Sequence, residues 1–147
     1  MIVAVDFDGV LVENRFPDIG DEVPCMVELA RDLMRRGHEV ILWTSRVDER
    51  LTEAVRWCEA RGIEFSAVNE NAPSNRAAFE SQYPNGTRKV YADVYLDDHS
   101  AEWALFSRQF GEEWTRRVMA RAVYSIMDYD EFGPAPDEEE EEEDYAV

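Results

Sequence analysis

Two aspartates one residue apart follow the apolar N-terminal run, in the segment Asp6-Phe7-Asp8-Gly9. Because strand side chains repeat every second residue, two carboxylates at a strand end can point the same way. Like charges this close oppose joint ionisation unless a cation lies beside them. Hard oxygen ligands suit Mg²⁺, and Gly9 lets the backbone turn sharply beside a ligand. The segment predicts a magnesium-dependent phosphoryl-transfer site, and the alternative is a solvated turn, because Asp and Gly also form turns.

The elements that must position these carboxylates alternate between strand and helix patterns. Met26, Leu29, Ala30 and Leu33 recur at the spacing of one helix face. Trp114, Val118, Ala122 and Ile126 are expected to form the inner face of the last helix. The predicted strands span 2–7, 39–44, 64–68 and 90–96, and the predicted helices span 24–36, 48–61, 101–110 and 112–128. Segment 11–22 is predicted to fold as a flap over the first strand's end, and 69–88 as a long loop with one short helical turn.

Alternating strands and helices predict an α/β fold with a parallel sheet and right-handed crossovers. Ligands of such sheets bind beyond the C-terminal ends of the strands. Polar residues follow three of the predicted strands there, and a fourth loop carries Lys89, the only lysine of the chain. The residues expected at this edge are Asp6, Asp8, Thr44, Ser45, Lys89, Asp97 and Asp98.

Taken in order, these segments resemble the four motifs of the haloacid dehalogenase superfamily of phosphatases and phosphotransferases. The motifs read Asp6-Phe7-Asp8-Gly9, Ile41-Leu42-Trp43-Thr44, Lys89, and Val94-Tyr95-Leu96-Asp97-Asp98. The match covers roughly residues 1–100, and the chain looks like a small member without a cap domain. One departure is Val10, where that family often has Thr or Ser. The resemblance implies a Rossmann-like three-layer sandwich in which strand one is central, strands two and three lie on one side, and strand four lies on the other.

The resemblance also implies roles for these residues. Asp6 is expected to attack phosphorus and form an aspartyl-phosphate, and Asp8 to act as general acid and base. Asp6, Asp8 through its backbone carbonyl, Asp97 and Asp98 are expected to hold Mg²⁺. Thr44 and Lys89 are expected to donate to the phosphoryl oxygens, with Arg88 as the alternative cation to Lys89.

Five further residues are candidates for the substrate side of the site. Gly9, Ser45 and Arg46 are expected to bind substrate; the alternative for Arg46 is a surface salt bridge. Asn69 and Asn71 are expected either to line the substrate side or to form a turn. The aromatic residues Trp103, Phe106, Phe110 and Trp114 are expected to pack the C-terminal helices onto the sheet, and a homodimer contact is the alternative.

Composition restricts the class of protein. The 147 residues carry a net charge of −18, which argues against nucleic-acid and anionic-membrane partners. Cys25 and Cys58 are expected to be reduced residues of helices. The sequence shows neither a signal peptide nor a membrane-spanning apolar segment, and we expect a cytoplasmic protein. We predict one domain over 1–132 and a disordered acidic tail over 133–147.

The sequence therefore predicts a magnesium-dependent phosphatase acting on a small phosphorylated metabolite, such as a sugar phosphate or nucleotide. One alternative is a non-catalytic module of the same fold that recruits a partner through its acidic tail. A receiver domain of a signalling relay fits poorly, because receivers carry the phosphorylated aspartate after strand three, and here that strand ends in Val68-Asn69.

Overall fold

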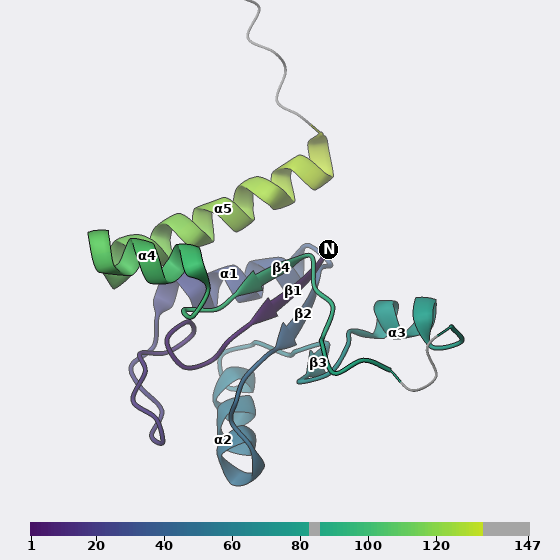
Figure 1. Ribbon diagram of the computed structural model, residues 1–147, viewed down its shortest axis with the longest axis horizontal. Helices are drawn as coiled ribbons and strands as arrows, with labels where there is room; N and C mark the ends of the chain where they lie inside the picture. Colours follow the sequence, from purple (N-terminus) through teal and green to yellow (C-terminus); the bar gives the residue numbers. More distant parts are fainter. Residues whose placement is uncertain (83–85, 134–147) are drawn as a thin grey trace, which may run out of the picture.

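The computed structural model describes residues 1–82 and 86–133, so the predicted acidic tail lies outside the described residues except for Gly133. Four strands and five helices alternate along this part of the chain until α5 follows α4 directly (Figure 1). The strands are β1 (Ile2–Val5), β2 (Glu39–Leu42), β3 (Ala67–Val68) and β4 (Val94–Leu96). The helices are α1 (Pro24–Arg35), α2 (Asp48–Glu59), α3 (Pro73–Phe79), α4 (Ala101–Phe110) and α5 (Glu112–Phe132).

The sheet has the order β3-β2-β1-β4, and all its pairs are parallel. Val3 lies opposite both Val40 of β2 and Val94 of β4. The predicted α/β class, the parallel sheet and the central position of β1 are therefore confirmed. Because every strand runs the same way, their C-terminal ends meet at one edge, which is where the arrowheads of β1 and β4 end in Figure 1.

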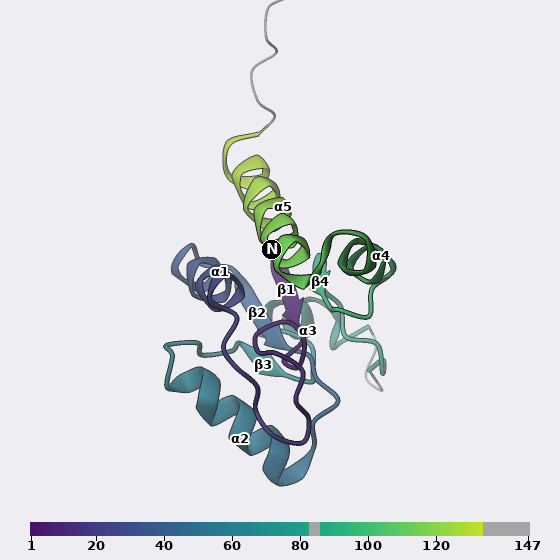
Figure 2. The ribbon, with the colours of Figure 1, turned by 90° about the vertical axis from the view of Figure 1, so that its left-hand side faces the viewer.

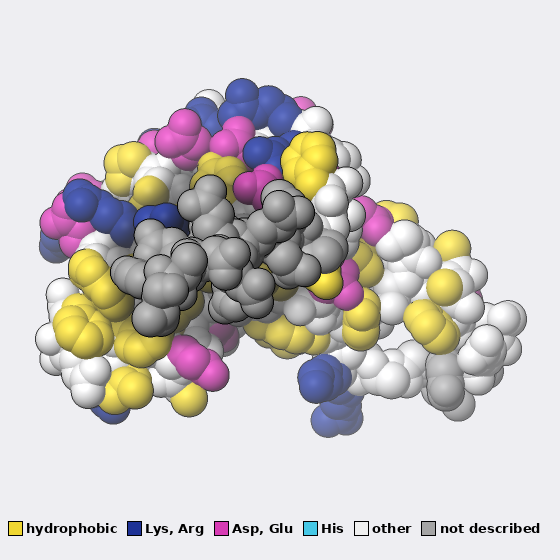
Figure 3. All heavy atoms as spheres, turned by 90° about the horizontal axis from the view of Figure 1, so that it is seen from above, with side chains coloured by type: hydrophobic (Ala, Val, Ile, Leu, Met, Phe, Trp, Pro, Cys, Tyr) yellow, Lys and Arg dark blue, Asp and Glu magenta, His cyan; other side chains and the backbone are white. Residues whose placement is uncertain are grey.

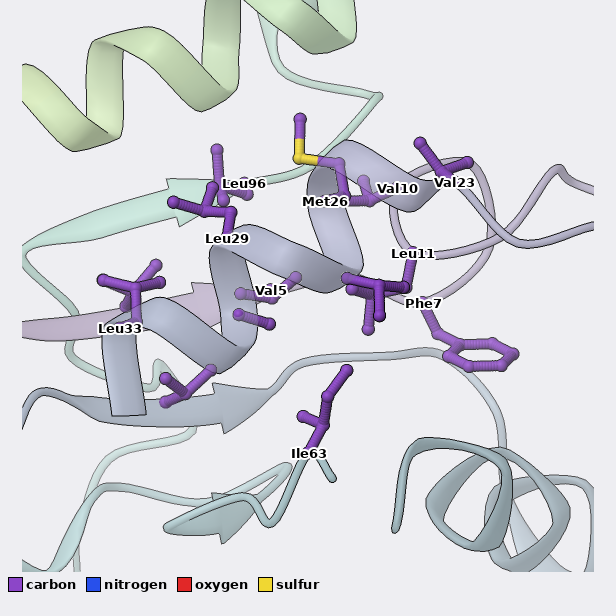
Figure 4. Packing of buried hydrophobic residues seen from close by; sticks show 14 of the residues in the cluster. Val5, Phe7, Val10, Leu11, Val23, Met26, Leu29, Leu33, Ile63 and Leu96 are labelled. Carbon is purple, nitrogen blue, oxygen red and sulfur yellow. The ribbon is translucent and has the colours of Figure 1, made fainter. Parts of the chain in front are cut away.

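Both faces of the sheet are covered, which accounts for the unbroken apolar sequence of β1. Val3 and Val5 point into the main core, where α1 packs Met26, Leu29 and Leu33 against them (Figure 4). Ile2 and Ala4 point to the other face. Seen from the strand ends, α4 lies beyond the β4 edge of the sheet, away from α1 (Figure 2), and its buried Trp103 belongs to the main core. The residues covering the second face include Ile41, Ala67, Ala72, Val90 and Ala92.

The strands are shorter than predicted. The N-cap residues of α1 and α2 are Val23 and Val47, and neither helix start has a side-chain cap. The short helical turn predicted within 69–88 is the helix α3, which buries none of its residues and stands beside the sheet (Figure 1). Both cysteines are free; Cys58 is buried and Cys25 is half-buried.

The predicted inner face of α5 is wrong. Trp114, Ala122 and Ile126 are exposed, and the helix instead buries Thr115, Arg116, Ala120, Val123 and Met127. Of the four aromatic residues expected against the sheet, Trp103 alone is buried.

Phe106, Phe110 and Trp114 contact one another where α4 meets α5, with 4.5 Å between the ring centroids of Phe110 and Trp114. Hydrophobic side chains gather on the surface at that end of the molecule (Figure 3). The homodimer contact stays a prediction. Across the described residues, no helix combines the length and the apolar character needed to cross a bilayer.

Candidate metal and phosphoryl-transfer site

Three carboxylates meet at the C-terminal ends of β1 and β4. Asp6, Asp97 and Asp98 each offer an oxygen, and these atoms lie within 4.8 Å of one another. Pairing of β1 with β4 produces this convergence, because the Asp6 amide continues the ladder by donating to the Leu96 carbonyl at 2.9 Å. All three residues are half-buried. The sequence prediction that two strand ends supply neighbouring acids is therefore confirmed by the geometry.

Asp98 packs directly against the backbone of Gly9. A β-carbon at position 9 would lie 2.3 Å from Asp98 Oδ2, and Gly9 has a φ of +88°, which side chains disfavour. Asp98 Oδ1 is buried without a hydrogen-bond partner among the described residues. An unpartnered buried carboxylate oxygen beside two further carboxylates is a costly arrangement that a divalent cation relieves. The donor set, made of oxygen atoms alone, fits a hard cation such as Mg²⁺.

The electrostatics of the three carboxylates agree with this fit. The pKa of Asp6 is raised to about 7, and burial is the largest cause. The Phe7 amide, which donates to Asp6, lowers this pKa, whereas the charges of Asp97 and Asp98 raise it. Burial also raises the pKa of Asp98, against the lowering effect of His99. Both raised pKa values mean that the ionised carboxylates are disfavoured here, first by burial and then by the charges of their neighbours, so that a bound cation would be stabilising.

The Asp8 carboxylate faces a buried arginine, a partner that the sequence did not predict. Arg46 donates from Nε to Asp8 Oδ2 and from Nη2 to Asp8 Oδ1, both at 2.7 Å. The Asp8 side chain does not belong to the carboxylate cluster. The Arg46 side chain is 1% exposed, so its ion pair with Asp8 is buried and the expected surface salt bridge is wrong. Substrate binding by Arg46 stays a prediction. The sequence did not predict Arg46 as the buried partner of Asp8, because no local pattern indicates that an arginine after a strand is buried.

Thr44 is held at the end of β2 by Asn69. The Thr44 amide donates to Asn69 Oδ1 at 2.8 Å, and Asn69 Nδ2 donates to the Thr44 carbonyl at 2.9 Å. The Thr44 hydroxyl accepts from the Arg46 amide at 3.2 Å, which leaves its own hydrogen available to donate. Ser45 beside it is exposed. Asn69 therefore fixes the loop after β2. This role is structural, as in the turn interpretation, but it also positions Thr44, a candidate residue of the site.

Within the described residues, no hydrogen bond or ion pair joins the third predicted motif to the aspartates. Lys89 and Arg88 are both exposed, and the Lys89 carbonyl accepts from the Thr87 hydroxyl. The segment that carries them is tied to the loop after β3, because the Tyr91 amide donates to Asn71 Oδ1 at 2.7 Å. Lys89 also precedes β4, whereas Asp97 follows it. A phosphate contact by either cation therefore stays a prediction.

Arg116 of α5 supports the loop that carries Gly9, and sequence reasoning missed it. Its Nη2 donates to the Gly9 carbonyl at 3.4 Å and to Glu13 Oε2 at 3.0 Å. Arg116 holds the pKa of Glu13 below its usual range. The signal available in the sequence was the spacing: Arg116 lies four residues before Ala120, on the helix face that α5 buries. The exposed His99 lies 4.0 Å from Asp98 through its Nε2, at the outer side of the site.

Comparison with known proteins gives one informative match. A solved structure of a conserved protein from Bacteroides thetaiotaomicron is 40% identical to this chain and superposes with a TM-score of 0.60. The match covers 77% of this chain and 91% of that one. No model of a known protein family matches the sequence, and no curated protein matches it. At this identity and coverage, the chain belongs to the same protein family as the conserved protein from Bacteroides thetaiotaomicron.

Proposed function

We propose that this protein is a cytoplasmic, magnesium-dependent phosphomonoester hydrolase of the haloacid dehalogenase type, acting on a small phosphorylated metabolite. The observation that carries the proposal is the Asp6, Asp97 and Asp98 cluster, in which Asp98 Oδ1 is buried without a partner among the described residues. The order of the sequence motifs supports the same chemistry. An acidic cluster alone is compatible with other roles, and the aspartate pair Asp6 and Asp8 before a glycine favours phosphoryl transfer.

Asp6, Asp97 and Asp98 would hold the Mg²⁺ ion. The bound ion would neutralise the neighbouring carboxylates and polarise the phosphoryl oxygens. The remaining chemistry belongs to the chain. Thr44, fixed by Asn69, carries a hydroxyl whose hydrogen is free to donate to a phosphoryl oxygen.

Asp6 is the nucleophile in this proposal. The Phe7 amide donates to Asp6 Oδ1 at 2.7 Å and so fixes the orientation of the carboxylate. A carboxylate oxygen of Asp6 forms a bond to phosphorus while the bond from phosphorus to the leaving alkoxide breaks. Water then attacks the aspartyl-phosphate, which releases inorganic phosphate and regenerates Asp6. Asp8 handles the protons, giving one to the leaving oxygen and later taking one from the attacking water.

The test is hydrolysis of an aryl phosphate and of a panel of sugar phosphates and nucleotides, with and without Mg²⁺. Wild type is compared with Asp6→Asn, which preserves shape and removes the nucleophile. Asp93→Asn is the matched control, because Asp93 accepts from the Ile2 amide and the Tyr91 hydroxyl and belongs to no metal cluster. We expect Mg²⁺-dependent release that Asp6→Asn loses and Asp93→Asn keeps. Full activity of Asp6→Asn would refute the aspartyl-phosphate route.

A further inference from the structure

We propose that Arg46 is a positioning residue that joins the Asp8 carboxylate to the tip of the flap (residues 11–22), so that both hold a single arrangement. The proposal rests on the proposed function where it concerns the role of Asp8 in turnover. The joining itself is a physical property of the protein, which can be measured without a substrate.

The first observation is the geometry of the ion pair. Nε and Nη2 of Arg46 each lie 2.7 Å from a different oxygen of Asp8, which is the two-pronged arrangement of a guanidinium on a carboxylate. Two parallel hydrogen bonds fix the plane of the carboxylate as well as its position. The Asp8 side chain is 15% exposed, so solvent competes little for the same oxygens.

The second observation is that the same guanidinium binds the flap. Nη1 donates to the Pro17 carbonyl at 3.2 Å, and Nη2 donates to the Asp18 carbonyl at 2.8 Å. The guanidinium carbon also lies 5.1 Å from the ring centroid of Phe7 and 5.3 Å from that of Phe16. Arg46 therefore contacts the flap tip by hydrogen bonds and by an aromatic face.

The base of the flap is secured separately. The Glu13 amide donates to the Asp21 carbonyl at 2.8 Å, and the Val23 amide donates to the Leu11 carbonyl at 2.9 Å. These bonds close the two arms of the flap near the sheet. The residues between the arms, from 14 to 20, depend on Arg46 for the side-chain hydrogen bonds that reach the carbonyls of Pro17 and Asp18.

Arginine is needed at this position because a single side chain must supply four donors in a plane. Lysine has three donors around one point and cannot bind a carboxylate in two prongs while reaching two carbonyls beyond it. Displacing the flap tip would remove the hydrogen bonds of Arg46 to the flap carbonyls. Removing the Asp8 carboxylate would remove the other hydrogen bonds that orient Arg46. The coupling must therefore act in both directions.

The experiment is limited trypsin digestion, followed by mass spectrometry of cleavage after Arg15, whose side chain is 63% exposed within the flap. The variants are Arg46→Lys, Asp8→Asn and the double variant. Arg61→Lys is the matched control, because Arg61 binds Glu22 at the flap base with 2.5 Å between Nε and Oε2 and does not contact Asp8 or the flap tip. Thermal unfolding of each variant establishes that it is folded.

We expect Arg46→Lys and Asp8→Asn each to speed cleavage after Arg15 by about tenfold, because cleavage follows the population of the open flap. Arg61→Lys should stay close to wild type. The double variant should open no further than either single variant, because both remove the same link. Unchanged cleavage in both folded single variants would overturn the proposal, and so would an additive effect in the double variant.

A kinetic readout separates positioning from simple stability. With an aryl phosphate, Arg46→Lys should lower kcat by about a hundredfold, the cost typical of a misplaced catalytic group, with little change in KM. Equal activity of Arg46→Lys and wild type would overturn the positioning role. If wild type hydrolysed no phosphate ester, the proposed function would fail, whereas the digestion would still decide the coupling between Asp8 and the flap.

Discussion

Asp98 and Gly9 are in direct contact, and the contact leaves no space for a side chain at position 9. A β-carbon there would approach Asp98 Oδ2 to 2.3 Å and Asp98 Cγ to 2.6 Å. The glycine of the first motif therefore has a steric partner in the fourth motif. This explains how a turn after β1 and a turn after β4 settle into one arrangement of carboxylates.

Substitution of Gly9 should disturb the carboxylate cluster as well as the backbone. Gly9→Ala is expected to cost at least about 2 kcal/mol of unfolding free energy, because it adds backbone strain and displaces Asp98. Gly37→Ala is the matched control, because Gly37 has a similar φ of +81° and nothing within 4 Å of the added carbon. Thermal unfolding with and without Mg²⁺ measures both effects. A normal Mg²⁺ response in Gly9→Ala would contradict the steric link.

Asp6→Asn should stabilise the metal-free protein at alkaline pH. The folded-state pKa of Asp6 is raised to about 7, so its stabilising contribution is present at low pH and is lost as pH rises through 7. Removing the charge should raise the unfolding free energy by about 2 kcal/mol at pH 8, after allowance for solvent screening.

The gain in Asp6→Asn should shrink as pH falls from 7 towards 4, because the wild-type carboxyl then becomes neutral in the folded state. At saturating Mg²⁺ the order should invert, since wild type alone keeps all three ligands. Thermal melts across pH provide the measurement. A destabilised Asp6→Asn at pH 8 without metal would show that burial of the Asp6 charge and its repulsion by Asp97 and Asp98 do not destabilise the folded protein.

Binding of Mg²⁺ should strengthen with pH. A proton must leave Asp6 before the carboxylate can bind the ion, and the raised pKa of about 7 places this competition near neutrality. We expect the apparent affinity to be about tenfold weaker at pH 6 than at pH 8. Titration calorimetry would measure the affinity at each pH and the proton released on binding. Equal affinities at the two pH values would exclude Asp6 as a titrating ligand.

The pairing of Asn69 with Thr44 predicts a loss of turnover when the amide side chain is removed. Asn69→Gly keeps the φ of +51° accessible and deletes both hydrogen bonds, which should cost about 1–3 kcal/mol. A less ordered Thr44 should lower kcat about tenfold. Asn71→Gly serves as control, because Asn71 accepts from the Tyr91 amide and does not contact Thr44. Equal kcat losses in the two variants would assign the effect to stability alone.

The fold and half of the site were predictable because their signals are local. Each strand that ends in a polar residue places that residue at one known edge of a parallel sheet. Asp97 and Asp98 therefore met Asp6 as predicted. The environment of Asp8 was not predictable, since it depends on Arg46 turning inward beneath a flap that forms from a different segment.

The inner face of α5 was wrong for a geometric reason. The predicted residues recur every four positions, and such a row drifts by about 40° per step around a helix with 3.6 residues per turn. The buried residues Arg116, Ala120, Val123 and Met127 alternate steps of four and three, which keeps them on one side. Several apolar rows coexist on this helix, and the position of α1 decides which one is buried.

The order of the strands also has a consequence for how the protein forms during synthesis. Asp6 is made about ninety residues before its partners Asp97 and Asp98, and the pairing of β1 with β4 brings them together. Contacts this distant along the chain close late in folding. A nascent chain that ends before β4 would bring together none of the three carboxylates, so the cluster would form in one step when β4 pairs with β1.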